Sequence, residues 1–165
     1  MLSESRSERL GEAVQPVLLQ AERLHGDELY QAPHEGDWSP MRILAHIAEL
    51  VPYWARQAAE LARRDQDDLP FGRTADDPDR IAAVEDHHAD GLDEALSRLR
   101  SGLVEAVALL RALPEAGWSR TGRHPRRGQM TVQQVVDDFL LDHLDEHAAQ
   151  LDRTIRALRG RTGPI

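Results

Sequence analysis

Apolar residues recur at helical spacing in four stretches of the chain, at about residues 7–28, 39–64, 77–114 and 131–160. In each stretch they return every three or four positions, which places them on one face of a helix. No stretch alternates apolar and polar residues convincingly enough to indicate a strand. The pattern therefore predicts an all-α protein, a four-helix bundle, in which each helix buries its apolar face.

Capping residues and prolines sharpen the helix boundaries. Ser39-Pro40 and Asp77-Pro78 each combine an N-cap side chain with a proline at the first helical position, and Thr131 can cap the last helix. Pro16 and Pro52 lie inside the first and second helices. Because proline lacks a backbone donor, both helices should bend there.

Two histidines stand on the apolar side of the last predicted helix. His143 and His147 are separated by four residues, so they project one turn apart from the same face. Burying a polar group without a partner costs roughly 2–7 kcal/mol, and a metal ion is one partner that could satisfy both rings. In a chain with eight histidines such a pair also arises by chance. The apolar residues that share the face are Val132, Val136, Phe139, Leu140, Leu144, Leu151 and Leu158.

A third ligand could come from a neighbouring helix. His46 falls at the edge of the apolar stripe of the second helix, near Leu50 and Tyr53. A metal site built from side chains on facing helices is typical of such bundles. Taken alone, His46 is better interpreted as a hydrogen-bonded core or boundary histidine.

The remaining histidines are weaker candidates. His87 and His88 are adjacent and point in different directions, so only His88 is kept as a reserve ligand. His124 lies with three arginines in the connection 114–130, where either a substrate contact or solvent exposure is expected. His25 and His34 read as surface residues.

Composition narrows the class of protein. The 165 residues suffice for one domain, taken here as 1–165. A net charge of −9 argues against nucleic-acid binding, and the chain has no apolar run that would cross a membrane. Lysine is absent, which excludes Schiff-base chemistry, and cysteine is absent, which excludes disulfides and thiolate ligands. We expect a cytoplasmic protein that acts on a small molecule.

Three motifs follow one another in a recognisable order. They are Trp38-Ser39-Pro40 with a histidine eight residues after the tryptophan, the run 124–132 with the form H-P-x-x-G-x-M-T, and the H-x-x-x-H pair within 142–151. Together they resemble the DinB/YfiT-like superfamily of metal-binding four-helix proteins. The resemblance extends from about Gln15 to Arg159, and its specificity lies in the order of the motifs.

The resemblance implies a function as well as a fold. It implies that His46, His143 and His147 correspond to three ligands of a divalent metal, usually zinc or nickel. Several members of the superfamily are S-transferases that use mycothiol or bacillithiol, and others are thiol-dependent isomerases. Three neutral histidines with an open coordination position suit catalysis rather than a closed structural site.

We therefore expect a metal-dependent S-transferase or a related hydrolase, in which the metal activates a low-molecular-weight thiol or water. The thiol has to come from a cosubstrate, because the chain has no cysteine. The metal should leave as the pH falls below roughly 6, where ordinary imidazoles protonate. The alternative is a bundle that binds a metal, a small ligand or a partner protein without turnover. With either function, the bundle could pair as a homodimer.

Overall fold

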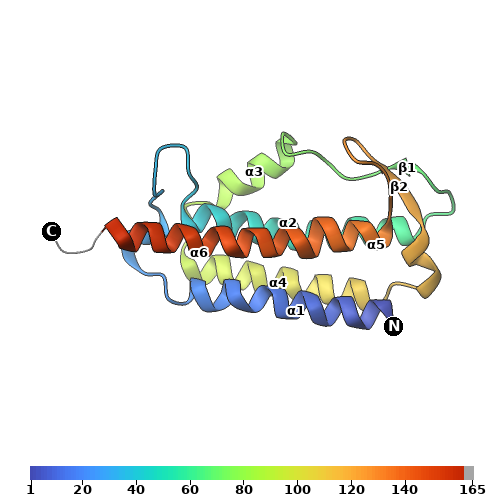
Figure 1. Ribbon diagram of the computed structural model, residues 1–165, viewed down its shortest axis with the longest axis horizontal. Helices are drawn as coiled ribbons and strands as arrows, with labels where there is room; N and C mark the ends of the chain where they lie inside the picture. The colour runs from blue at the N-terminus through green and yellow to red at the C-terminus, as the bar shows by residue number, and fades with distance from the viewer. Residues whose placement is uncertain (162–165) are drawn as a thin grey trace.

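Four long helices form the body of the protein in a computed structural model that describes residues 1–161 (Figure 1). They are α1 (Leu2–Ala21), α2 (Pro40–Arg63), α4 (Leu92–Arg111) and α6 (His143–Arg161). α1 and α6 run in one direction along the long axis, and α2 and α4 run in the other (Figure 1). The predicted four-helix bundle is confirmed, and apolar side chains from all four helices make a single core. None of the helices within 1–161 is long and apolar enough to cross a bilayer.

The three predicted caps are in place. The Ser39 hydroxyl accepts a hydrogen bond from the backbone N–H of Arg42, three residues on. Asp77 does the same at the start of α3 (Pro78–His87). Thr131 and Gln134 form a reciprocal capping box at the start of the last helix. Local chemistry therefore fixes where these helices begin.

Two predicted helix ranges are wrong. The first helix starts at Leu2 rather than near Ser7, and it ends at Ala21, after which Gly26–Leu29 forms the short 3-10 helix η1. The third prediction covers two helices, because α3 ends at His87 and α4 begins after the N-cap Gly91. Since α3 stands apart from the bundle core, Ile81 is 45% exposed instead of facing inward.

The expectation of no strands is also wrong. β1 (Leu69–Pro70), β2 (Thr121–His124) and β3 (Gly128–Thr131) form a small sheet in that order. β2 and β3 make an antiparallel hairpin, and β1 pairs with β2 in parallel. Gly128 has a φ of +71°, a conformation that favours glycine and allows the tight turn. Strands of two to four residues are too short to produce a readable alternation. The 3-10 helix η2 (Glu115–Ser119) precedes the hairpin.

The connection between α2 and α4 shapes the functional face. These two helices pack together and run in parallel, so the chain between them has to return along the length of the bundle (Figure 1). β1 and α3 lie within this crossover, and α3 packs against α2. A crossover of this kind places residues 64–91 over one side of the bundle, where they cover the candidate functional site.

The last helix changes its hydrogen-bonding pattern partway along. The α-helical turn α5 (Val132–Gln134) continues into a π-helical segment, η3 (Val135–Asp142), and then into α6. Such segments are rare and occur often at functional sites. Here the π-helical segment ends immediately before His143. The apolar stripe predicted for this helix is buried, apart from the partly exposed Phe139.

Candidate metal centre

His46, His143 and His147 come together between α2 and α6. Each offers one ring nitrogen, and these three atoms all lie within 4.8 Å of one another. The ring centroid of His46 is 5.7 Å from that of His143 and 4.5 Å from that of His147. The structure thus brings together all three residues singled out in the sequence.

His46 is the most deeply buried member of the cluster. It is 1% exposed, and neither ring nitrogen has a hydrogen-bond partner among the described residues. The rings of Trp38 and His46 are nearly perpendicular, with centroids 5.5 Å apart, and a Glu49 carboxylate oxygen lies 3.6 Å from Nδ1 of His46. Glu49 is itself ion-paired with Arg73. A buried imidazole with two unpaired nitrogens is unfavourable by itself and suits a ligand.

The other two histidines are oriented by hydrogen bonds. His147 Nδ1 lies 2.7 Å from the side-chain oxygen of Gln150, one helical turn away. An amide oxygen can only accept, so Nδ1 carries the proton and Nε2 keeps its lone pair. That Nε2 is buried and unpaired within the part of the chain described. His143 is hydrogen-bonded to the backbone of Phe139. These outer contacts are the usual means of aiming imidazoles at a metal.

Burial keeps the cluster neutral. Loss of solvation, with the charge of neighbouring groups, lowers the pKa of His46 to about 2 and that of His143 to about 4. Burial also lowers the pKa of His147. Neutral imidazole is the form that binds metal. Protons therefore compete with a metal at a lower pH than the value of about 6 expected from ordinary imidazoles.

The reserve ligand His88 is not part of the cluster. Its Nδ1 contacts the backbone oxygen of Glu85 at 2.6 Å, and its neighbour His87 pairs with Asp90. His87 is the last residue of α3 and His88 is its C-cap. His25 and His34 are exposed, as predicted.

His124 is buried, so of the two alternatives given for it, solvent exposure is wrong, whereas its place in the lining of the cavity described next is compatible with a substrate contact. It is 5% exposed, and its Nε2 lies 2.9 Å from the backbone oxygen of Arg73. Its Nδ1 accepts hydrogen bonds from the backbone N–H groups of Arg126 and Arg127. His124 therefore ties the hairpin turn to the crossover.

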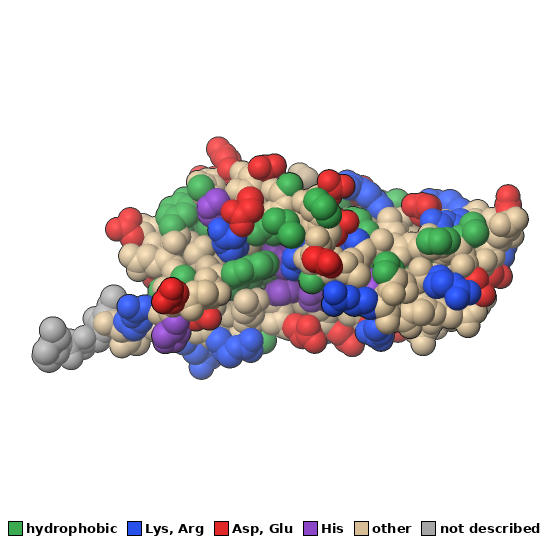
Figure 2. All heavy atoms as spheres, turned by 90° about the horizontal axis from the view of Figure 1, so that it is seen from above, with side chains coloured by type: hydrophobic (Ala, Val, Ile, Leu, Met, Phe, Trp, Pro, Cys, Tyr) green, Lys and Arg blue, Asp and Glu red, His purple; other side chains and the backbone are tan. Residues whose placement is uncertain are grey.

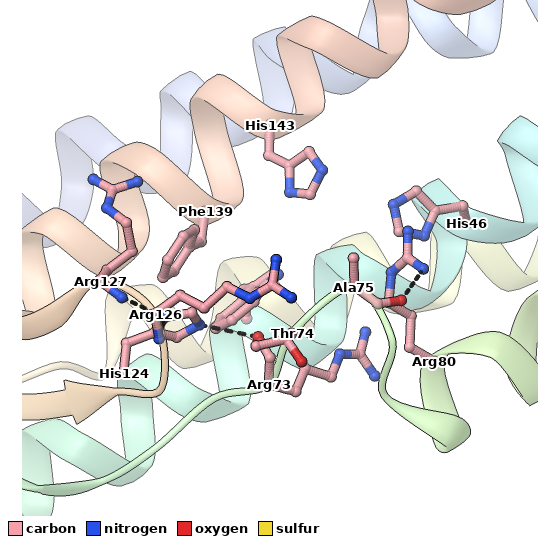
Figure 3. A pocket seen from close by; sticks show the side chains of 11 residues that line it. His46, Arg73, Thr74, Ala75, Arg80, His124, Arg126, Arg127, Phe139 and His143 are labelled. Carbon is pink, nitrogen blue, oxygen red and sulfur yellow. Dashed lines mark hydrogen bonds between the residues drawn. The ribbon is translucent and has the colours of Figure 1, made fainter.

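A cavity of about 300 Å³ opens beside the histidine cluster (Figure 3). In the space-filling view onto the face covered by α3, histidine side chains lie in the middle of that face with basic side chains beside them (Figure 2). Sequence reasoning missed Arg73 and Arg80, because nothing local shows that the crossover folds over His46. The cavity is lined by His46, Trp54, Arg73, Thr74, Ala75, Arg80, His124, Arg126, Arg127, Phe139 and His143.

A family model covers most of the chain. The model described as the DinB superfamily matches residues 11–151. The chain therefore belongs to the DinB superfamily. A search of curated protein sequences finds no match.

Solved structures share the fold at low sequence identity. YfiT from Bacillus subtilis, described as a probable metal-dependent hydrolase with an unusual four-helix bundle topology, superposes with a TM-score of 0.77 at 18% identity. The match covers 94% of this chain and 87% of YfiT. A mycothiol-dependent maleylpyruvate isomerase gives 0.66 at 13% identity. There the match covers 96% of this chain but 60% of the isomerase. Another four-helix bundle protein gives 0.52 at 21% identity, covering 94% of this chain and 98% of that protein.

Proposed function

We propose that this member of the DinB superfamily holds one divalent ion, zinc or nickel, between His46, His143 and His147, and that it is a metal-dependent transferase or hydrolase. The observation that carries the proposal is the convergence of three ring nitrogens within 4.8 Å. His46 and His147 suit a metal ion because each has a buried ring nitrogen without a hydrogen-bond partner, and a bound cation would interact with the lone pair of that nitrogen. All three donors are of a type that zinc and nickel accept.

Bound to neutral imidazoles, such an ion would keep its full charge and lower the pKa of a thiol or water brought to it. The residues that line the cavity give a small molecule access to the histidine cluster and a surface to bind. The cavity meets the cluster at His46 and His143, and Trp54 and Phe139 provide an apolar surface on which a small molecule can lie. The described structural relatives include a probable hydrolase and a thiol-dependent isomerase, which supports both versions of the proposal.

The lining of the cavity favours a thiol over water. None of the described residues that line it is Asp or Glu, and His124 already uses both ring nitrogens. No lining side chain is therefore free to act as a general base. A thiol ionises near pH 8.5 and water near 15.7, so a thiol needs far less help to become a nucleophile. We accordingly favour transfer to or from a low-molecular-weight thiol such as mycothiol or bacillithiol.

The metal content of the purified protein tests the first part. Protein prepared without a histidine tag should bind about one zinc or nickel ion per chain, measured by elemental analysis after equilibration and desalting. His46→Ala and His147→Ala should each reduce this below about 0.1 per chain, because two imidazoles hold a metal far more weakly than three. His34→Ala, which removes an exposed histidine, is the matched control. Unchanged metal content in His46→Ala would overturn the site.

Turnover tests the second part. Fully zinc-loaded and nickel-loaded protein is mixed with mycothiol or bacillithiol and a fluorogenic alkylating electrophile, and the rate is compared with that of His46→Ala. A rate that depends on His46 supports the transferase. Full metal occupancy without acceleration by either thiol would reject it and favour a bundle that binds metal without catalysis.

A further inference from the structure

Four arginines surround the cavity beside the histidine cluster. Arg73 and Arg80 come from the crossover between α2 and α4, whereas Arg126 and Arg127 come from the turn between β2 and β3 (Figure 3). These two pairs lie far apart in the sequence and meet only because the crossover and the hairpin cover the same side of the bundle. None of the described lining residues carries a negative charge.

Two of these arginines already have strong partners. Arg73 is ion-paired with Glu49, and its guanidinium lies 3.6 Å from the ring centroid of Tyr53. Arg127 pairs with Asp138 at 2.7 Å. These contacts hold both side chains in place and offset their charge, so Arg73 and Arg127 are best regarded as parts of the wall.

The other two arginines keep donors free for a ligand. Arg80 donates to the backbone oxygen of Ala75 at 2.8 Å, and it forms no ion pair with any residue in 1–161. Arg126 has one ion-pair contact, with Asp76 at 3.9 Å, and both of those side chains are largely exposed. A guanidinium presents five N–H donors that match a carboxylate in a two-point fork.

Arg80 and Arg126 enter the cavity from different sides (Figure 3). Arg80 lies on the side of His46, and Arg126 reaches in from the hairpin turn (Figure 3). Arg80 is close enough to the cluster for its charge to lower the pKa of His46, His143 and His147. A cation in that position repels a divalent ion held by the histidines, and an anion bound between the two offsets this repulsion.

The wall of the cavity beside His124 is apolar. Trp54 and Phe139 stack with ring centroids 4.5 Å apart and an interplanar angle of 29°. Both line the cavity. These rings offer an apolar surface for the short carbon chain or planar body of a ligand that the arginines hold.

We propose that this cavity binds a small organic dianion, with one anionic group between Arg80 and the histidine cluster and the second at Arg126. The inference rests on the proposed function and names the class of the second substrate, the one that meets the nucleophile. A negatively charged group next to Arg80 relieves its repulsion from the metal and fills its unused donors. The group at Arg126 fixes the other end.

Straight-chain dicarboxylates from malonate to adipate serve as probes. They are titrated into the zinc-loaded full chain by calorimetry, alongside the corresponding neutral diamides and the monocarboxylate of the same length. We expect one dicarboxylate to bind at least tenfold more tightly than its diamide and than its monocarboxylate. Arg80→Gln and Arg126→Gln should each weaken that dicarboxylate roughly tenfold or more, because each removes a charge-assisted contact. The control Arg156→Gln removes an exposed arginine on α6 that pairs with Asp152, and it should change nothing.

Zinc content, measured on every variant, separates this inference from the proposed function. If zinc binds at about one per chain and no dicarboxylate exceeds its diamide, the dianion inference is overturned while the metal site stands. If zinc does not bind, the proposed function fails, and the dicarboxylates are titrated into the protein without zinc. Dicarboxylate binding that is lost in Arg80→Gln and Arg126→Gln then supports the dianion inference, and absence of dicarboxylate binding overturns it. An equal loss in Arg156→Gln also overturns it, because the effect would then be one of general charge.

Discussion

Replacing His46 by leucine separates what this residue does for folding from what it does for a ligand. His46 is 1% exposed, and neither of its ring nitrogens has a hydrogen-bond partner among the residues described. Leucine has a similar size and no polar atoms. His46→Leu should therefore stabilise the metal-free protein and at the same time abolish metal binding.

The magnitude follows from the unpaired nitrogens. Leaving a buried polar group unsatisfied costs about 1–3 kcal/mol, so the free energy of unfolding should rise by roughly that amount. For a chain of this size, about 1 kcal/mol shifts the melting temperature by roughly 2–4 °C. The expected gain is therefore roughly 2–12 °C in the presence of a chelator. Zinc at 100 times its dissociation constant should raise the free energy of unfolding of the wild type by about 2.7 kcal/mol and that of the variant by little. The variant's advantage in stability should then shrink, or the wild type should become the more stable protein.

Acid should widen the difference between the metal-free proteins. Burial lowers the pKa of His46 to about 2 in the folded state, whereas the unfolded chain titrates near the ordinary value of 6.5. Below pH 6.5 His46 binds a proton in the unfolded state but stays neutral in the folded state, so the stability of the wild type falls as the pH falls. Each pH unit below 6.5 lowers the free energy of unfolding by up to about 1.4 kcal/mol per such histidine. The leucine variant does not lose the part that is due to His46.

Urea unfolding at pH 7.5 and 5.5, with EDTA or with zinc, measures all these quantities. His34→Leu is the matched control, because it replaces an exposed histidine and should change stability by no more than about 0.5 kcal/mol. A leucine variant less stable than the wild type in EDTA at both pH values would refute the reasoning, since it would mean that the buried imidazole is favourably bonded.

Three further predictions concern other parts of the structure. Because burial lowers the pKa of His143 to about 4, zinc bound at neutral pH should stay bound well below pH 6 and leave on further acidification; half-release near pH 6, followed with a colorimetric zinc indicator, would contradict this. Gln150→Ala removes the contact that orients one imidazole and should weaken zinc binding about tenfold in a competition titration, whereas the exposed Gln133→Ala should not. In Gly122→Ala the new Cβ would lie 2.5 Å from a leucine side-chain carbon of α2, so thermal unfolding should show that the protein loses about 1–3 kcal/mol of stability. The control Gly11→Ala has no atom within 4 Å of its new Cβ, and it should raise the stability by up to about 1 kcal/mol. Equal effects of the two substitutions on stability would count against the packing described for the hairpin.

The sequence by itself determined the features that depend on near neighbours. Ser39, Asp77 and Thr131 cap helices where predicted, because a cap involves only the next three residues. The pairing of His143 with His147 follows from helical spacing alone. The order of the motifs added His46 through a family resemblance. The histidine cluster was thus predictable down to its residues.

Only the tertiary structure decided how that cluster is surrounded. α2 and α4 pack in parallel, which forces the intervening chain back over the bundle and places Arg80 beside His46. The same return leads to the burial of His124, which contacts the crossover through a bond to residue 73. These contacts join residues about 30 to 50 positions apart. No local pattern of apolar and polar residues encodes them, because they depend on which helix faces pack together and therefore on where the connections have to run.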